Sequence, residues 1–225
     1  MSLAIGIMNR IDTENSTPSV TGCQGIGSSK YVMIAKNINA DTFGNGVAIP
    51  LITDQAAWNA AGAAGTPARC FYNNDPANGD IYGQLYNLAA MTLAETTNDG
   101  WPGYLRSNGW RALRNGTGST INPEMASFAG VPSASRGGRL KAKGTQYWSV
   151  PNTGATNATG FTGLPGGQRT DSVFESITTN AYFWCLRGGG ETRAVSLDYN
   201  QESLDSIVAI PETYGLSVRV GRQCS

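Results

Sequence analysis

The residue types that most often carry chemistry are unusually distributed in this chain. No histidine occurs among its 225 residues, so the commonest general base and metal ligand is missing, and Ser-His-Asp and Cys-His catalysis are excluded. The four cysteines are Cys23, Cys70, Cys185 and Cys224, and none lies in a CxxC pair, which argues against zinc. We expect two disulfides in an oxidising location, with the pairing left open. The alternative is four buried thiols of a protein kept reduced.

Two further sequence patterns could carry chemistry. The run LPGGQR (164–169) fits neither a P-loop nor a dinucleotide-binding turn. We expect Gly166 and Gly167 to permit a tight turn there, and Arg169 to hydrogen-bond nearby carbonyls. NNDPANGD (73–80) and NDGW (98–101) hold oxygens of the kind that calcium prefers, but such clusters usually form turns. No metal and no cofactor are predicted.

The composition limits the possible partners. Lys plus Arg number 16 and Asp plus Glu number 16, so no basic surface for nucleic acid is expected. No apolar run reaches the roughly 18 residues of a membrane-spanning helix, so no membrane insertion is expected. The 29 glycines indicate many turns and a loop-rich domain.

The amino-terminal residues MSLAIGIMNRIDTEN lack the basic and apolar regions of a signal peptide. If disulfides form, either a leader has been removed, or the protein leaves its cell by another path such as lysis of an infected host. Because the sequence runs from Met1 to Ser225, we expect a natural, complete polypeptide such as a virion component. We interpret residues 1–29 as an amino-terminal arm or attachment segment, with a plain strand and loop as the alternative, and residues 30–225 as one domain.

Local patterns predict a few regular elements. Residues 31–35 (YVMIA) are typical of a strand. Residues 53–62 combine a capping Thr or Asp with an Ala-rich run that stops at glycine, which predicts a short helix. Trp110 and Leu113 share a spacing that predicts a helical turn or two within residues 107–116.

The carboxy-terminal third favours strands at 181–186, 192–199 and 215–220. In the last two runs apolar and polar residues alternate, which predicts one buried and one wet face of an antiparallel sheet. Residues 117–180 are mostly Gly, Ser, Thr, Asn and Pro. Their spaced aromatic residues are expected to anchor long ordered loops onto a core: Tyr147, Trp148, Phe161 and Phe174.

Several sequence blocks occur in a fixed order. In the second half they are GGRLKAKGTQYW (137–148), PNTGATNATGF (151–161), LPGGQR (164–169) and YGLSVRV (214–220). In the first half they are YVMIAKNIN (31–39), GVAIPLITDQAAW (46–58) and CFYNNDPANGDIYGQLYN (70–87). Together they resemble the Fibrobacter succinogenes major paralogous domain, a family of surface proteins, over roughly residues 30–220; the segment from Trp101 to Pro132 departs from the family pattern. The resemblance implies an α+β, C-type lectin-like fold with small antiparallel sheets, one or two short helices and long ordered loops.

The resemblance also implies recognition rather than catalysis. The expected function is a non-enzymatic adhesion module, displayed on a virion (of a Bacteroidetes phage) or on a bacterial cell surface, that binds a host-surface protein or glycan. The carboxy-terminal strands and loops would form the ligand face, because Tyr, Trp and Arg often dominate interface energies. The expected ligand-binding residues are Tyr182, Trp184, Arg187, Glu191, Arg193, Asp198, Tyr199 and Asn200. The alternative for Tyr182 and Trp184 is that they alternate into the core.

Two other functions remain open. The chain is alternatively a structural subunit of a virion or surface assembly, such as a fibre, tail or capsid decoration, whose face contacts neighbouring subunits. We expect a homo-oligomer. The resemblance of the fold to formylglycine-generating enzymes leaves an oxidase as a third possibility, which requires a redox-active cysteine pair.

Overall fold

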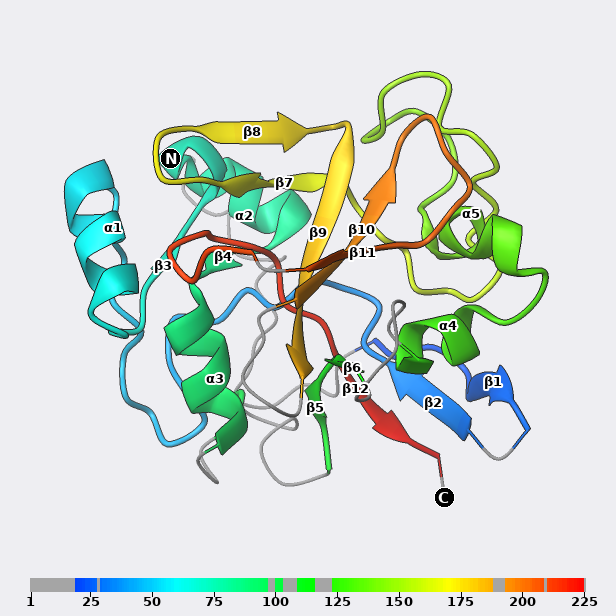
Figure 1. Ribbon diagram of the computed structural model, residues 1–225, viewed down its shortest axis with the longest axis horizontal. Coiled ribbons are helices and arrows are strands. Elements are labelled where there is room, and N and C mark those ends of the chain that lie inside the picture. Colours follow the sequence, from blue (N-terminus) through cyan, green and yellow to red (C-terminus); the bar gives the residue numbers. More distant parts are fainter. Residues whose placement is uncertain are drawn as a thin grey trace, which may run out of the picture.

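The computed structural model describes residues 19–27, 29–96, 100–102, 109–115, 123–187, 193–208 and 210–224. Small sheets and short helices are mixed along this part of the chain, which confirms the α+β expectation. Figure 1 shows long strands at the centre, with α1 and α3 on one side and α4 and α5 on the other. No helix among the described residues is long and apolar enough to cross a membrane.

The central sheet has the strand order β11-β10-β9-β7-β8, and β6 pairs in parallel with β9. Its strands are β6 (Arg114–Asn115), β7 (Gly166–Arg169), β8 (Phe174–Ile177), β9 (Asn180–Arg187), β10 (Arg193–Asp198) and β11 (Asp205–Val208). Strands β9 and β10 are antiparallel over six residue pairs, from Arg193↔Cys185 to Asp198↔Asn180. The predicted strands at 181–186 and 192–199 are therefore confirmed.

Apolar clusters cover both faces of this sheet. Along β9, Phe183 packs into one cluster and Trp184 into another. Ala194 and Ser196 of β10 are buried, although they alternate with the buried Val195. The prediction that alternate positions of β10 are wet is therefore wrong, because β10 lies between two layers and has no free face.

A second sheet brings the two ends of the described chain together. Its order is β1 (Gln24–Ile26), β2 (Ser29–Met33), β12 (Val220–Gln223) and β5 (Arg111–Ala112). The predicted strand at 31–35 corresponds to β2. Residues 19–27 belong to this sheet through β1 and the bridge from Val20 to Ile34, whereas residues 1–18 lie outside the described part.

Two local predictions near this sheet are wrong. Residues 111–112 and 114–115 form β5 and β6 instead of helical turns, because they pair with β12 and β9. Residues 215–217 make isolated bridges instead of a regular strand. Ser217 and Arg219 are buried, so the polar positions of the 215–220 run do not face water.

Five α-helices surround the sheets in the described residues, more than the one or two expected. They are α1 (Gln55–Ala63), α2 (Pro76–Tyr82), α3 (Leu88–Thr96), α4 (Pro123–Ala129) and α5 (Arg136–Leu140). The predicted helix at 53–62 is α1, and Asp54 caps it by accepting from the Ala57 backbone N–H at 2.8 Å. Within NNDPANGD, Asp75 caps α2 by accepting from the Ala77 N–H at 2.9 Å.

A short strand pair frames the segment that carries α2. Strands β3 (Arg69–Cys70) and β4 (Leu85–Tyr86) pair antiparallel. The short 3-10 turns are η1 (Tyr72–Asn74) and η3 (Ser133–Ser135). The β3–β4 pair therefore brackets η1 and α2 in sequence and fixes both ends of the segment that carries α2.

Candidate ligand-binding site

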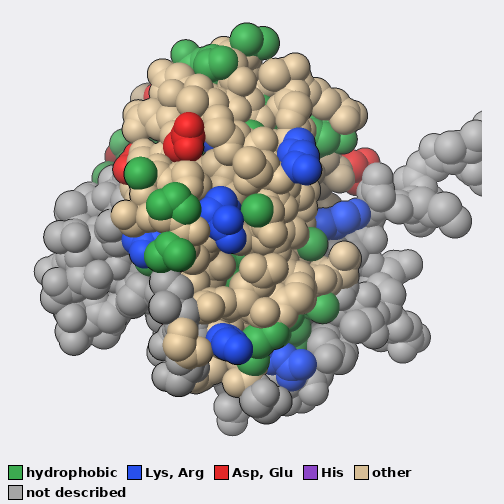
Figure 2. Space-filling view, turned by 90° about the vertical axis from the view of Figure 1, so that its right-hand side faces the viewer, with side chains coloured by type: hydrophobic (Ala, Val, Ile, Leu, Met, Phe, Trp, Pro, Cys, Tyr) green, Lys and Arg blue, Asp and Glu red, His purple; other side chains and the backbone are tan. Residues whose placement is uncertain are grey.

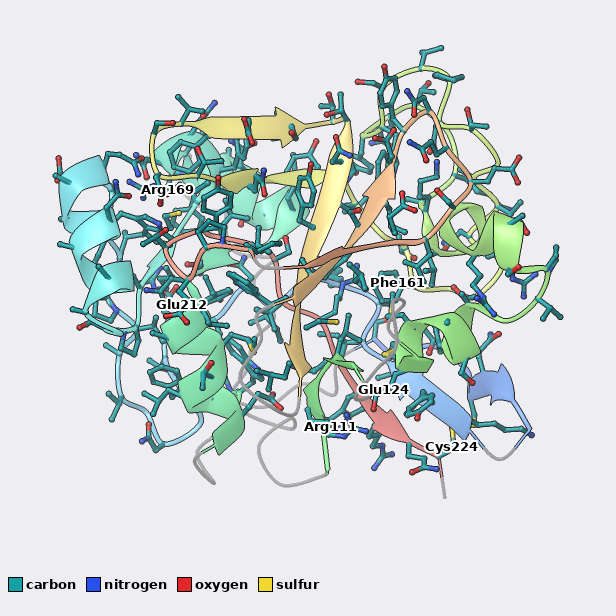
Figure 3. The ribbon with its side chains drawn as sticks, viewed as in Figure 1. Arg111, Glu124, Phe161, Arg169, Glu212 and Cys224 are labelled. Atoms are coloured by element: carbon teal, nitrogen blue, oxygen red, sulfur yellow. A yellow bond between two sulfur atoms is a disulfide. The ribbon has the colours of Figure 1, made fainter. Side chains whose placement is uncertain are left out.

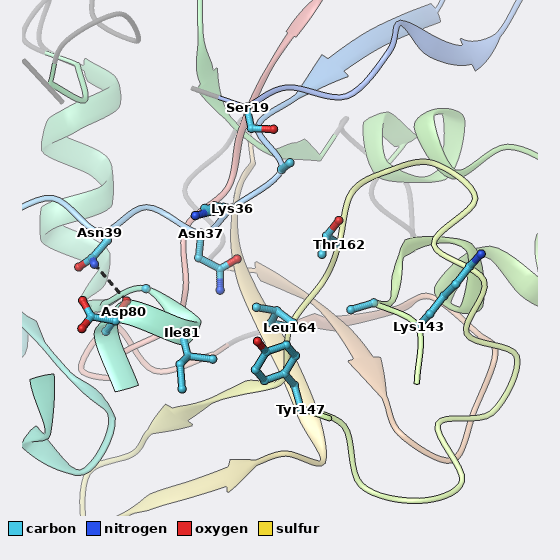
Figure 4. Close-up of a pocket in the computed structure, with 14 residues that line it drawn as sticks. Ser19, Lys36, Asn37, Asn39, Asp80, Ile81, Lys143, Tyr147, Thr162 and Leu164 are labelled. Atoms are coloured by element: carbon cyan, nitrogen blue, oxygen red, sulfur yellow. Dashed lines mark hydrogen bonds between the residues drawn. The ribbon is translucent and has the colours of Figure 1, made fainter. Parts of the chain in front are cut away.

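A cavity of about 430 Å³ opens between α2, the segment after β2 and the chain that joins α5 to β7. We call residues 142–163 of that connection the 142–163 loop. Tyr147, Ile81 and Leu164 line the apolar part of the cavity, and Figure 4 shows them grouped around its centre. The volume lies within the roughly 300–1,000 Å³ that is typical of small-molecule sites.

The ring of Tyr147 is held in place by packing against another aromatic ring. It meets Tyr82 of α2 edge to face, with centroids 6.2 Å apart and planes at 80°, and such a pair adds to the energy of burial. Ile81, the neighbour of Tyr82, keeps 43% of its surface exposed. An aromatic ring and an exposed aliphatic side chain therefore stand together at an open cavity.

The amides in the cavity wall brace it. Asn37 donates to the Tyr82 carbonyl at 2.6 Å and accepts from Arg219. Asn39 donates to the Gly79 carbonyl at 3.0 Å. Gly83 allows the segment to come this close, because a Cβ there would lie 2.7 Å from the Ile38 carbonyl oxygen and the residue has φ +75. These bonds fasten residues 37–39 to α2 and fix one wall.

Charged side chains stand at the edge of the cavity. Lys36, Asp80 and Lys143 line it and are exposed. Figure 4 shows Lys36 and Asp80 on one side and Lys143 on the opposite side. The edge of the cavity is therefore charged and hydrated, whereas its centre is apolar.

The 142–163 loop forms the other wall, and a buried lysine fastens it. The Nζ of Lys141 donates to the carbonyls of Thr153 at 2.9 Å, Asp198 at 2.7 Å and Gln201 at 2.8 Å. The Trp148 ring centroid lies 5.4 Å from the same atom. Burial lowers the pKa of Lys141 to about 8, against the opposing effect of Asp198 and Glu202, so the ammonium form still dominates at pH 7.

Other polar contacts close the loop on itself. Asn152 donates to the carbonyls of Ala142 at 3.0 Å and Gly144 at 2.6 Å. Trp148 donates from Nε1 to the Gly163 carbonyl at 3.0 Å. Trp148 and Phe161 are buried, which confirms the prediction that these spaced aromatic residues anchor an ordered loop.

Two buried arginines repeat the arrangement seen at Lys141. Arg169 donates to the carbonyls of Ile52 at 2.7 Å and Thr53 at 3.0 Å and lies 4.5 Å from the Trp58 ring centroid (Figure 3). The prediction that Arg169 bonds to nearby carbonyls is confirmed. Gly166 and Gly167 lie within β7 rather than in a turn, with Gly167 at φ +63.

Arg219 joins the loop to the second sheet. It donates to the carbonyls of Ile34 and Phe161, each at 2.7 Å, and of Thr162 at 3.0 Å. The Phe161 ring centroid lies 4.2 Å from its guanidinium carbon. Lys141, Arg169 and Arg219 thus share one arrangement. In each case a buried cation donates to backbone carbonyls and lies against an aromatic ring, which orders irregular backbone.

The predicted ligand face does not form one surface among the described residues. Trp184 is buried and donates from Nε1 to the Tyr86 carbonyl at 2.7 Å, so it is a core residue and its assignment as a ligand contact is wrong. Tyr182 is half-buried against the same cluster, whereas Tyr199 packs against the cluster on the other face. The β9–β10 sheet is therefore internal.

The remaining members of that face divide into two groups. Asp198 accepts from the Asn180 side chain and from the Asn200 backbone N–H, both at 2.9 Å, so it shapes a turn next to the exposed Asn200. Glu191 and the side chains of Arg187 and Arg193 lie outside what the structure describes.

The cysteines form one disulfide instead of two. Cys23 and Cys224 are bonded, with Cα atoms 6.3 Å apart. Figure 3 shows Cys224 at the end of β12. Cys70 and Cys185 are buried and are not disulfide-bonded, so the prediction of a disulfide is wrong for this second pair. Burial raises the pKa of the Cys70 thiol to about 11, although Arg169 lowers it, and the thiol therefore stays protonated at neutral pH.

Charge is spread thinly over the protein. In the described residues no group of three or more His, Cys, Asp or Glu side chains could hold a metal ion; Asn98 and Asp99 lie outside that part. Figure 2 shows Lys and Arg scattered over one face rather than gathered into a patch. Among the described residues, the cavity is therefore the candidate binding site.

The geometry defines an α+β domain whose cavity is walled by a long, internally bonded loop. The family model described as the Fibrobacter succinogenes major domain matches residues 29–221. The chain belongs to this family, as the sequence blocks indicated. No curated protein and no solved structure matches the chain.

The sequence analysis assigned none of the charged or aromatic residues of the cavity to a common binding site. Lys36, Asp80 and Tyr147 come from three separate blocks of the family pattern. Each of these residues lies in a polar stretch next to a buried run, which is a weak sign of a functional residue. Their convergence on one cavity depends on contacts between segments that are distant in sequence. A local pattern shows no such contacts.

Proposed function

We propose that this protein is a non-enzymatic recognition module, displayed on a virion or a bacterial cell surface, that binds a glycan or protein on a host surface. The ligand would enter the cavity between α2 and the 142–163 loop. The observation that carries the proposal is the combination of Tyr147, the exposed Ile81 and rim charges around one open cavity. An apolar platform with a few polar groups at its edge is typical of binding sites.

A saccharide suits this cavity best. Sugar rings present an apolar face of C–H groups and an edge of hydroxyls, and the cavity presents an aromatic ring beside amide, hydroxyl and charged groups. Thr162 and Asp80 offer hydroxyl and carboxylate oxygens on opposite sides of Tyr147 (Figure 4). A peptide side chain is the second ligand class, and the experiment below separates the two.

The C-type lectin-like fold belongs to the same proposal. The small sheets, the long loop between α5 and β7, and the second sheet that joins β1 and β2 to β12 support it. The Cys23–Cys224 disulfide fits an oxidising location outside the cell. Several copies on one particle would convert weak single-site binding into firm attachment, which is why we retain the homo-oligomer in the proposal.

The lack of an enzymatic function is supported by chemistry. The sequence has no histidine, and the thiols of Cys70 and Cys185 are buried. Reactive cysteines are usually partly exposed and have a lowered pKa, whereas the pKa of Cys70 is raised. A formylglycine-generating-type oxidase needs an accessible cysteine pair, so recognition is the better proposal.

A binding screen tests this function. Wild-type protein is applied to an array of bacterial and host glycans and to whole host cells, together with Tyr147→Ala and Lys143→Met. Tyr147→Ala should weaken binding by at least about tenfold, because losing an aromatic anchor often costs more than 1 kcal/mol.

Two controls make the screen decisive. Val150→Ala changes an exposed residue of the same loop outside the cavity, and Lys30→Met removes an exposed ammonium outside the cavity; both should bind as the wild type does. Binding to cells that survives enzymatic removal of their glycans would favour a protein ligand. Equal binding by Tyr147→Ala and wild type would reject the cavity as the site.

A further inference from the structure

The carbonyl oxygens of Thr153, Asp198 and Gln201 converge on a single point inside the protein. They come from the 142–163 loop, from the last residue of β10 and from the connection between β10 and β11. Carbonyl oxygens carry partial negative charge, so three of them at one point repel one another unless a cation lies between them. In loop-rich proteins a bound metal ion often fills such a position.

Here the Lys141 ammonium fills it. An ammonium group has three N–H donors and no acceptor, which matches the three carbonyls at 2.7 to 2.9 Å. The side chain is completely buried, and Trp148 covers it. Every donor is used, so the group has no capacity left for water.

The backbones around Lys141 also approach closely. A Cβ at Gly137 would lie 1.8 Å from the Ser203 carbonyl oxygen, and one at Gly138 would lie 2.2 Å from that of Gly154. Gly138 further donates to the Glu202 carbonyl at 3.0 Å. Helix α5, the middle of the 142–163 loop and the β10–β11 connection therefore meet at one packed junction.

This junction is linked to the cavity through the same loop. Lys143 and Tyr147 line the cavity, and both lie between Lys141 and its aromatic cover Trp148. Thr162, which accepts from Arg219, lines the opposite end. The position of the cavity wall therefore depends on where the junction holds the loop.

We infer that the Lys141 ammonium is an internal cation that takes the place of a metal ion and preassembles the cavity wall formed by the 142–163 loop. The inference rests on the proposed function for its relevance to ligand binding. It makes Lys141 a positioning residue that does not touch the ligand. The site is accordingly ready for its ligand in a metal-free protein.

Hydrogen exchange without ligand tests the inference. Lys141→Met keeps the length of the side chain but removes the ammonium, and Lys143→Met is the matched control two residues away at an exposed position. Lys141→Met should speed amide exchange in residues 142–163 and 198–204 by about tenfold or more, with β2 and β12 unchanged, because local opening has its own free energy. Lys143→Met, and wild type treated with EDTA, should both exchange at the rates of untreated wild type.

The inference would be overturned if the amides of Lys141→Met exchanged as slowly as those of wild type. It would also be overturned if EDTA strongly reduced the protection of the wild-type amides. If Lys141→Met does not fold, Lys141→Ala is refolded with propylammonium, whose length matches the deleted atoms, or with propanol as the neutral control. Rescue by propylammonium alone supports the internal cation; equal results with both compounds contradict it. None of these readouts needs a ligand, so they stay informative even if the binding screen fails.

A binding measurement then connects the two proposals. If wild type binds a glycan, Lys141→Met should bind it more weakly while EDTA leaves wild-type affinity unchanged. Exchange that behaves as expected without any glycan binding would reject the proposed function and keep the internal cation. Unchanged affinity in Lys141→Met would show that the wall does not depend on Lys141.

Discussion

The central sheet and the 142–163 loop are ordered in different ways, although they touch. The sheet is fixed by apolar side chains on both faces, such as Phe183 and Val195, together with its ladder of backbone hydrogen bonds. The loop has no ladder, and it is fixed at a few points by Lys141, Asn152 and Trp148. Order in this family domain therefore does not require regular structure, since a buried cation can satisfy several carbonyls of irregular backbone at once.

The difference predicts where single substitutions matter most. In the sheet each side chain makes one of many apolar contacts, so most contacts remain when one is lost. In the loop one side chain donates to several carbonyls, so its loss removes several hydrogen bonds at once. The four predictions below separate these two modes, from the largest expected effect to the smallest.

Arg219→Met should be the most damaging of these changes. It leaves the carbonyls of Ile34, Phe161 and Thr162 without their donor, and we expect the free energy of unfolding to fall by about 4 kcal/mol. Arg222→Met, in the partly exposed part of β12, should cost less than about 1 kcal/mol. Urea denaturation measures both, and equal losses in the two variants would contradict the special role of the buried arginine.

Removal of the disulfide should affect the second sheet and leave the loop ordered. The bond joins residues 201 positions apart, and the double variant Cys23→Ser/Cys224→Ser should lose about 3 kcal/mol of unfolding free energy. Mass spectrometry tests the disulfide itself by counting the thiol labels that the wild-type protein takes up. Wild type unfolded without reductant should take up two thiol labels and, after reduction, four; four labels without reductant would contradict the bond.

Gly137→Ala should disturb the junction around Lys141. The new methyl group would collide with the Ser203 carbonyl oxygen, and such overpacking costs about 2 kcal/mol. Gly22→Ala is the control, because a Cβ there meets no atom within 4 Å. Thermal unfolding of the two variants compares them, and a melting temperature for Gly137→Ala equal to that of the control would show that the junction is loose.

The smallest expected effect is a dependence on pH. Burial lowers the pKa of Lys141 to about 8 in the folded protein, while an unfolded lysine titrates near about 10.4. Between these values the folded state binds fewer protons than the unfolded state, so the free energy of unfolding should rise with pH, by about 1 kcal/mol between about pH 7 and pH 9. The charged groups that face the ammonium, Asp198 and Glu202, limit the rise.

The difference in unfolding free energy between wild type and Lys141→Met isolates the contribution of Lys141 titration, because the other groups titrate alike in both proteins. Denaturation curves at pH 7, 8, 9 and 10 should show wild type gaining stability relative to the variant. A relative loss with rising pH would mean that the folded state raises the pKa of the lysine.

The sequence predicted those elements whose cause is local. The strands β9 and β10 follow from apolar, β-branched and aromatic runs, and α1 follows from the cap at Asp54 and the glycine near its end. Arg169 was recognised as a partner of carbonyls, because an arginine next to glycines in a buried motif has few other roles.

What could not be predicted depends on distant contacts. The alternation around Arg219 indicated a wet face, but Phe161 and Thr162, about sixty positions earlier in the chain, cover it and accept its hydrogen bonds. The helical spacing of Trp110 and Leu113 was outweighed by pairing of β5 and β6 with β12 and β9. The cavity was missed because its walls come from segments that are far apart in sequence.

The most direct test of the central claim is equilibrium binding to the best array glycan, measured in EDTA for wild type and Tyr147→Ala. Circular dichroism first establishes that both proteins are folded. A metal-free, preassembled cavity predicts that wild type binds in EDTA as well as in calcium, and that Tyr147→Ala binds at least about tenfold more weakly. Wild-type binding that requires calcium, or undiminished binding by Tyr147→Ala, would contradict the account.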